Sequence, residues 1–353
     1  MKNTLKARFF DKTDGYVIDF AIFICYNAIC ISIFGKNSLA EAVMEKTFLT
    51  VGNAEISLDC NIDKIPLSGE TTVERGDREI APGGFGVYTA AAIAELGAHS
   101  ALCACIGGDR YAEMLTRFCK AADIMCDALF ADKQMPTAFR LQLTEKNGSK
   151  RSVFYPGAYD GIRHSFIEEA FTLRPDAAVA SFALPSEHVG YISEMCDLQD
   201  IPLFMDAEGL TPAFPYSVLY PCEAVVFDEA QAFRISHIYP DSMDNCLKCA
   251  VKLKSVINTK HVVIKLRERG IYVYDGRYCG IASHRGAETF ATSHSAEVFI
   301  SALAYTFMQT KNMEVAAKYA AIALAVYTKN GGGIASLPDA DSIGKYCEDN
   351  DIY

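Results

Sequence analysis

The sequence lacks the features of a nucleic-acid-binding protein. Its 353 residues include 44 acidic and only 33 basic side chains, which gives a formal net charge of -11. No basic run and no patch of basic and aromatic residues offsets this acidic excess. Because phosphate backbones are bound mainly through Lys and Arg, we expect no nucleic-acid partner. A small-molecule ligand is the better expectation.

The sequence also lacks a cysteine pattern typical of a disulfide framework or a zinc site. Its 13 cysteines are scattered along a chain that is too long to need disulfide staples. The one tight pair with metal-like spacing, Cys246 and Cys249, has no second pair of Cys or His nearby. We therefore interpret both as helical cysteines in a reducing cytoplasm, and we predict a cytoplasmic protein.

One long hydrophobic run lies near the N-terminus. Residues 16–34, YVIDFAIFICYNAICISIF, are barely long enough to cross a bilayer, which takes about 20 residues, and Asp19 and Asn27 interrupt them. A membrane segment and a signal peptide are therefore the weaker interpretations. The first credible strand begins just after Met44. We favour the hypothesis that residues 1–43 are an appended segment or an upstream-start artefact outside the fold.

The rest of the chain shows no internal repeat, no low-complexity tract and no linker between two independent domains. Apolar strand-like segments alternate with amphipathic helix-like segments. Strands are expected at 48–52, 101–107, 177–182, 202–207, 223–227 and 261–265, and helices at 87–97, 110–122, 186–197, 243–257, 295–309 and 313–328. This alternation predicts an α/β fold with a doubly wound, mostly parallel central sheet flanked by helices.

Two stretches interrupt this alternation. Residues 53–80 and 137–155 alternate polar and apolar side chains, and the second contains the hairpin signal Asn147-Gly148. We interpret both as antiparallel strands of a small protruding β-sheet, a lid that covers a ligand. A free strand edge tends to be covered, so the lid could join two copies in a homodimer. The domain then spans residues 44–338, and residues 339–353 form a short acidic tail.

The segment GGFGVYTAAAIAELGA, residues 83–98, has two adjacent glycines, a third two positions on, and a helix of small residues ending in Leu-Gly-Ala. It resembles the first signature of the PfkB/ribokinase family of carbohydrate kinases. The similarity continues in the same order over residues 46–338. The resemblance implies a mostly parallel sheet with a β-lid. It also implies transfer of the ATP γ-phosphate, with Mg²⁺, to a hydroxyl of a sugar, nucleoside or similar small alcohol.

The resemblance places the acceptor at Ser57, Gly83, Gly84 and Tyr88. Ser57 stands where the family usually has a sugar-binding Asp, and Tyr88 where it usually has Asn. Ser57 could donate to a hydroxyl, and Tyr88 could stack on a ring or a base. Alternatively, both are ordinary strand-end and helix-start residues. The glycines still permit a tight backbone turn and the close approach of a ligand.

The sequence ATSHSAE stands where the family has the catalytic loop D-T-x-G-A-G-D. Alignment places Ala291 at the first Asp, His294 and Ala296 at the glycines, and Glu297 at the catalytic Asp. Glu297 therefore keeps a carboxylate that could act as general base. The anion-hole loop becomes His294, Ser295 and Ala296, with an imidazole where the family leaves the phosphate path clear.

A simpler interpretation of the same loop is structural. Thr292 or Ser293 would cap a helix, and Glu297 would lie in its first turn, where the helix dipole favours an acid. Even with the catalytic interpretation, the extra methylene of Glu moves the carboxylate by over an ångström, and such a displacement can cost about a hundredfold in rate.

The nucleotide side also departs from the family pattern. Asp228 and Gln231 replace the family's Asn-x-x-Glu, which leaves a weak metal site for Mg²⁺. Lys265 and Arg267 replace its Thr-x-Gly, where they would reach a phosphate or form a solvated charged turn. We expect an ATP-dependent carbohydrate kinase with degraded catalytic and nucleotide motifs. The alternative is a pseudokinase, a non-catalytic paralogue that binds a sugar, nucleoside or nucleotide in a regulatory or structural role.

Overall fold

The computed structural model describes residues 46–72, 79–145, 149–282 and 293–352. The hydrophobic run at 16–34, the Asn147-Gly148 turn and Ala291 lie outside these ranges. Within them, the helices are too short or too polar to cross a membrane.

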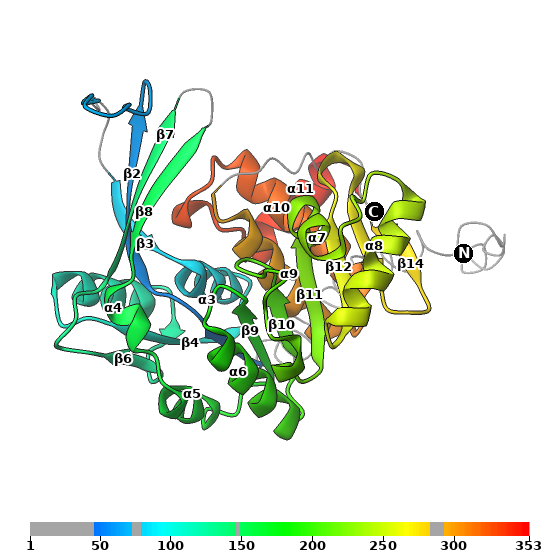
Figure 1. Cartoon of the computed structure of the whole chain (residues 1–353), viewed down its shortest axis with the longest axis horizontal. Coiled ribbons are helices and arrows are strands. Elements are labelled where there is room, and N and C mark those ends of the chain that lie inside the picture. Colours follow the sequence, from blue (N-terminus) through cyan, green and yellow to red (C-terminus); the bar gives the residue numbers. More distant parts are fainter. Residues whose placement is uncertain (1–45, 73–78, 146–148, 283–292, 353) are drawn as a thin grey trace, which may run out of the picture.

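A ten-stranded central sheet forms the middle of the molecule (Figure 1). Its strands are β1 (Thr47–Val51), β4 (His99–Ile106), β5 (Ile124–Met125), β6 (Leu129–Ala131), β9 (Ala177–Ser181), β10 (Leu203–Asp206), β11 (Cys222–Asp228), β12 (Thr259–Lys265), β13 (Ile271–Tyr274) and β14 (Cys279–Ala282). The order is β14-β13-β12-β11-β10-β9-β1-β4-β5, and β6 pairs with β4. The pairs of β13 with β12 and with β14 are antiparallel, and the other pairs in the described sheet are parallel.

Helices cover both faces of this sheet, which confirms the predicted doubly wound α/β fold. They are α3 (Phe85–Glu95), α4 (Arg110–Ala121), α5 (His164–Phe171), α6 (Ser186–Leu198), α7 (Glu229–Ser236), α8 (Met243–Val256), α9 (Ser295–Thr310), α10 (Met313–Lys329) and α11 (Ala340–Asp349). Successive residues of one strand point to opposite faces of the sheet and are buried in different cores. Phe48 belongs to the core that α9 and α10 cover, whereas Leu49 belongs to the core that α5, α6 and α8 cover. Because both faces are covered, the parallel strands are mainly apolar on both sides, and most of their charged residues lie at or near the strand ends.

A second, four-stranded sheet projects from the main body (Figure 1). It consists of β3 (Glu79–Gly83), β2 (Glu55–Ile62), β7 (Ala138–Glu145) and β8 (Lys150–Tyr155), in that order. The β2–β7 pair is parallel, so the predicted lid is a mixed sheet rather than a wholly antiparallel one.

The register of the lid strands separates a polar face from an apolar face. Ser57 pairs with Arg140 on one face. On the other face, Ile80, Val153 and Tyr155 leave 42%, 68% and 50% of their surfaces exposed. This separation follows from the period of two in a strand, which the sequence pattern had indicated.

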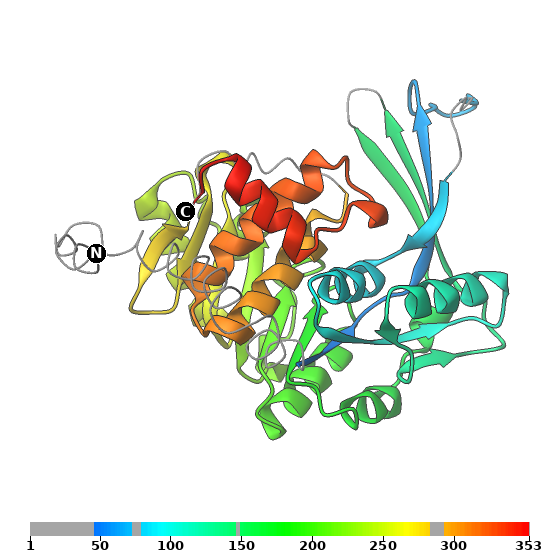
Figure 2. The ribbon, with the colours of Figure 1, turned by 180° about the vertical axis from the view of Figure 1, so that it is seen from behind.

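The segment expected to be a short acidic tail contains α11, which packs on α10 (Figure 2). The Asp339 side chain accepts a hydrogen bond from the Ser342 N–H at 2.8 Å and so caps the helix. Ile343 and Cys347 are buried in the core shared with α9 and α10. The folded unit therefore extends past residue 338, because this acidic segment also carries an apolar helical stripe.

Candidate functional site

The candidate site lies at the carboxyl edge of the central sheet. Asp206, Asp228 and Lys265 end the neighbouring parallel strands β10, β11 and β12. The first turn of α9 brings Glu297 to the same edge, where its negative charge acts on Asp206. Open α/β sheets bind their ligands at the carboxyl ends of strands, so the architecture favours this edge.

The N-terminus of α9 begins in an unusual backbone conformation. His294 is its N-cap residue, with a left-handed φ of 62° and no capping hydrogen bond from its side chain. The structural interpretation of the loop is therefore wrong for Ser293, which precedes the N-cap, while Thr292 lies outside the described residues. His294 Nδ1 lies 3.0 Å from Glu297 Oε1, so the imidazole points back at the predicted catalytic carboxylate.

The His294 ring also stacks on Tyr88, which lies in the first turn of α3. The two ring centroids are 3.5 Å apart and the rings are within 8° of parallel. Tyr88 is only 5% exposed. The structure thus joins the two motifs that the sequence had placed in separate parts of the site. Here Tyr88 stacks on an internal ring, a contact that no local sequence pattern signals.

The Glu297 carboxylate is buried but ionised. Burial by itself would raise its pKa, but the hydrogen bond and charge of His294, its own backbone N–H and the charge of Lys265 outweigh that effect. The pKa of Glu297 therefore lies below its ordinary value. At neutral pH the group carries a full negative charge next to an imidazole.

Two further carboxylates, which the sequence analysis missed, lie close to Glu297. Asp206 is 1% exposed, and its Oδ1 accepts the Glu208 N–H at 2.8 Å. Burial raises the pKa of Asp206 to about 6, with Glu297 and Asp228 adding to the rise and Lys265 opposing it. Glu208 is an exposed residue, but the protein around its carboxyl group still desolvates it. Together with Glu297 and Asp206, this desolvation raises the pKa of Glu208 to about 7. The sequence signal for Asp206 was its position as the acid that ends the apolar strand LFMD.

A bidentate ion pair on the polar face of the lid was also missed. Arg140 of β7 donates from Nε to Glu55 Oε1 at 2.5 Å and from Nη2 to Oε2 at 3.2 Å. The Glu55 side chain is completely buried, and Asn53 also donates to it at 2.5 Å. The Arg140 guanidinium lies 4.7 Å from the centre of the Phe154 ring. The sequence did contain a signal for this ion pair, since Arg140 is a charged residue at an inward-facing position of a strand with alternating polar and apolar side chains.

The two glycines predicted to bind the acceptor are also required by packing, because a side chain at either position would clash with its neighbours. A Cβ on Gly83 would lie 2.5 Å from Ser57 Oγ, and one on Gly84 would lie 2.7 Å from Asn53 Nδ2. Gly84 also has a φ of 93°, and Asn53 Oδ1 accepts the Phe85 N–H at 2.9 Å where α3 begins. These contacts place Ser57 next to the glycine turn, and the role of both in acceptor binding stays a prediction.

Asp228 and Gln231, predicted to hold a metal, bond to each other. Gln231 N–H donates to Asp228 Oδ1 at 2.6 Å, and Asp228 N–H donates to Gln231 Oε1 at 2.7 Å. This arrangement is a capping box at the start of α7. Across the described ranges, no three His, Cys, Asp or Glu side chains form a group that could hold a metal ion. The residues that are present therefore fit a Mg²⁺ site poorly.

The two predicted phosphate-binding cations are in different places. Lys265 Nζ lies 5.7 Å from the Phe299 ring centre, and its charge acts on Asp206 and Glu297, so it faces the site. Arg267 has a left-handed φ of 50°, is largely exposed, and pairs with Glu229 at 3.3 Å. Its contact is therefore with α7 rather than with Glu297.

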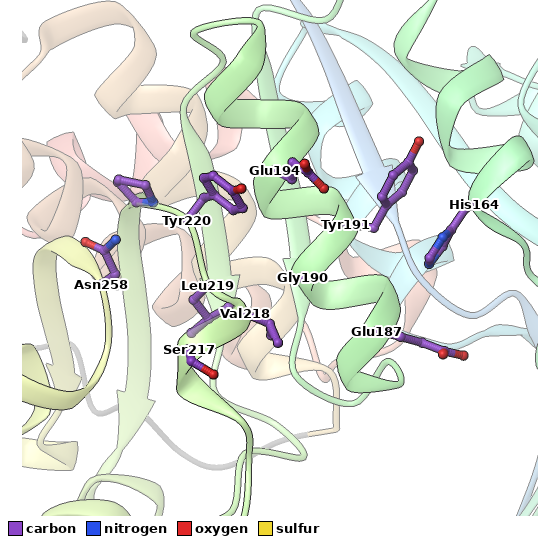
Figure 3. Close-up of a pocket in the computed structure, with 11 residues that line it drawn as sticks. His164, Glu187, Gly190, Tyr191, Glu194, Ser217, Val218, Leu219, Tyr220 and Asn258 are labelled. Atoms are coloured by element: carbon purple, nitrogen blue, oxygen red, sulfur yellow. The ribbon is translucent and has the colours of Figure 1, made fainter.

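A cavity of about 600 Å³ lies away from these residues (Figure 3). It is bordered by Tyr191 and Glu194 of α6, Tyr220 before β11, and Asn258 before β12. It therefore lies toward the amino edge of the strands, and none of the predicted site residues lines it.

Comparisons with known proteins agree with the observed fold and match most of the chain. The model of the pfkB family of carbohydrate kinases matches residues 46–340. A ribokinase of Bacillus subtilis (strain 168) is 21% identical over 310 residues, covering 84% of this chain and 98% of that protein. The structure of Arabidopsis thaliana ribokinase with ribose and ATP has a TM-score of 0.74 at 18% identity, covering 86% of this chain and 99% of that one. A nucleoside kinase of Methanocaldococcus jannaschii has a TM-score of 0.65 at 14% identity, covering 86% and 98%.

Proposed function

This chain belongs to the pfkB family of carbohydrate kinases, and we propose that it transfers the γ-phosphate of ATP to a hydroxyl of a sugar, nucleoside or similar small alcohol. The observation that carries the proposal is Glu297. Its carboxylate is ionised, held by His294, and located in the first turn of α9, where the resemblance places the catalytic acid. Such a negative charge supports removal of a proton from the attacking hydroxyl, either by the carboxylate or by the imidazole that it holds.

The start of α9 supports a role in binding phosphate. The backbone N–H groups of Ser295 and Ala296 donate no hydrogen bond to any described residue. Free N–H groups and the dipole of a 16-residue helix favour an anion at this end. Phosphoryl transfer is catalysed mainly by positioning and by neutralising charge, so these groups are of the required kind even without the family glycines.

Lys265 is the cation that we propose for a nucleotide phosphate, because it already faces Asp206 and Glu297. Arg267 would first have to leave Glu229 to do the same. ATP is proposed by relation to the A. thaliana ribokinase structure, which contains ribose and ATP. Asp228 and Gln231 bond to each other, so neither is proposed as a ligand of Mg²⁺.

We propose that the acceptor binds between Ser57 and the Glu55–Arg140 pair of the lid and the Tyr88–His294 stack of the body. Ser57 and Arg140 are register partners on the polar face of the lid. The changes at Ser57 and Tyr88, together with those at His294 and Ala296, are what we propose as degraded motifs. They support an acceptor held differently from the usual sugar of the family.

A second candidate function is a pseudokinase that binds a sugar, nucleoside or nucleotide without turnover. The specific observation in its favour is that the His294 ring, stacked on Tyr88, occupies the start of α9. A side chain there competes with a phosphate for the same space.

The apolar face of the lid supports a homodimer as a further part of this proposal. Ile80, Val153 and Tyr155 would be covered if two lids packed together. We also propose a cytoplasmic location, because the cysteines are scattered along the sequence and do not show the pattern of a disulfide framework.

The deciding experiment is calorimetric titration of the full chain with ATP and Mg²⁺, followed by ADP release across a panel of sugars and nucleosides. Binding with turnover that is lost in Glu297→Gln would support the kinase, and Glu95→Gln, an exposed acid at the end of α3, is the matched control. ATP binding without turnover for any acceptor would favour the pseudokinase. No binding at millimolar ATP would refute the kinase.

A further inference from the structure

His294 is held in one tautomer by the groups around it. Its Nδ1 lies 3.0 Å from Glu297 Oε1, and the lowered pKa of Glu297 means that this oxygen is an ionised acceptor. Nδ1 therefore donates the hydrogen, and in the neutral form of the imidazole Nε2, on the opposite side of the ring, keeps a lone pair. Nε2 forms no hydrogen bond with any residue in the described ranges. In its neutral form, an imidazole oriented in this way can accept a proton at Nε2.

The orientation of the ring is also fixed from its face and from its backbone. Tyr88 stacks on it at 3.5 Å, and the His294 backbone has a φ of 62°, a conformation that costs energy in residues other than glycine. The side chain is 20% exposed, so water reaches part of the ring. Tyr88, Glu297 and the backbone together hold the imidazole in a single position.

We propose that His294 Nε2, rather than Glu297, takes the proton of the acceptor hydroxyl, and that Glu297 is a positioning residue that orients the imidazole and stabilises the imidazolium. This inference rests on the proposed kinase function. The same division of roles between an imidazole and a carboxylate operates in hydrolytic triads.

The acceptor O–H bond breaks and its proton bonds to the lone pair of Nε2. The electron pair left on the oxygen forms the bond to the γ-phosphorus of a nucleoside triphosphate. The bond from that phosphorus to the bridging oxygen breaks, and its electron pair leaves with the nucleoside diphosphate. The imidazolium then returns its proton to solvent, and Glu297 stays ionised throughout.

The other charged and titratable groups around Glu297 come from several elements. They are Lys265 of β12, Asp206 of β10, Glu208 just after it, Arg140 of the lid and Tyr327 of α10. With pKa values of about 6 and about 7, Asp206 and Glu208 titrate in the range where an imidazole would act. A pH profile of the wild type therefore cannot assign the base, and the test must replace the imidazole itself.

The test is His294→Gly in the full chain, with ADP release measured from ATP and whichever acceptor of the sugar and nucleoside panel the wild type uses. Glycine adopts a φ of 62° without strain, so the variant should fold, and thermal melting checks this. We expect kcat to fall by about 10²- to 10⁴-fold, the usual contribution of a general base. Added imidazole should restore part of the loss and should not stimulate the wild type.

His237→Gly is the matched control. His237 also has a positive φ, of 59°, but it is exposed at the C-terminal end of α7. This variant should keep the wild-type kcat and show no response to imidazole. Glu297→Gln should lower kcat with little change in KM for the acceptor, because a positioning residue acts on the proton transfer and not on binding.

The outcomes are distinct. A His294→Gly variant that is as active as the wild type, or more active, would overturn the inference and show that the ring only obstructs the site. A loss that imidazole does not reverse would also overturn it. In both cases the kinase function would stand. A wild type that releases no ADP with any acceptor would instead refute the kinase, and the inference with it.

Discussion

Replacing Asp206 with Asn should stabilise the protein at pH 8 and change its stability little at pH 4. Asp206 is 1% exposed, and its second oxygen, Oδ2, has no hydrogen-bond partner among the described residues. Burial raises its pKa from 3.8 to about 6. Because the folded protein binds this proton more tightly than the unfolded chain, stability falls as the pH rises through that window.

The size of the effect follows from the pKa difference. The step from 3.8 to about 6 corresponds to about 3 kcal/mol of the free energy of unfolding, fully lost above about pH 7 and nearly all present at pH 4. Asn removes the charge and keeps an oxygen that can accept the Glu208 N–H. Lys265 loses a counter-charge in the variant, so about 3 kcal/mol is an upper limit.

Urea unfolding of the wild type and the variant at pH 8 and pH 4 measures this difference directly. The variant should be more stable at pH 8 by about 1–3 kcal/mol and by less than about 1 kcal/mol at pH 4. Asp127→Asn, at an exposed position between β5 and β6, is the control and should show no such pH dependence. A variant that is no more stable at pH 8, or that gains equally at both pH values, would refute the reasoning.

Two further predictions concern contacts around the site. Arg140→Met leaves the buried Glu55 carboxylate without its charged partner, and should lower the free energy of unfolding by about 2–4 kcal/mol. This is slightly below the range for a fully buried pair, because Arg140 is 30% exposed. The double variant with Glu55→Leu should recover much of that loss in urea unfolding; equal losses in the single and double variants would contradict it. Tyr327→Phe removes the hydroxyl that donates to the Ser293 carbonyl at 2.9 Å. The substitution should lower the free energy of unfolding by about 1 kcal/mol, which thermal melting measures. It should also lower kcat, because the start of α9 loses a hydrogen bond that holds it in place. An unchanged kcat would show that this hydrogen bond does not support the site.

The sequence by itself determined the layers of this protein. Buried strands such as β9, read as continuous apolar runs, and the small-residue helix α3 have patterns that depend only on neighbouring residues. The lid strands at 53–80 and 137–155 were visible for the same reason, since their period of two is a local property. The antiparallel edge strands β13 and β14 were not assigned from the sequence.

Within the candidate site, the sequence predicted a role for Glu297 because the motif order placed an acid at the start of a long helix, and a role for Lys265 at the end of a strand; both roles stay predictions. The capping role of Asp228 and Gln231 was also readable from their spacing of three, but the resemblance to a metal motif was preferred.

Only the tertiary structure decided what these residues touch. Tyr88 and His294 stack although they are far apart in the chain, and Glu55 pairs with Arg140 across two lid strands. The pKa of Asp206 is raised because strands and helices from several parts of the chain exclude water from it. Periodicity says which side of an element a residue occupies, but its partner is set by how the elements pack. The imidazole that we propose as the base became visible only once that packing was known.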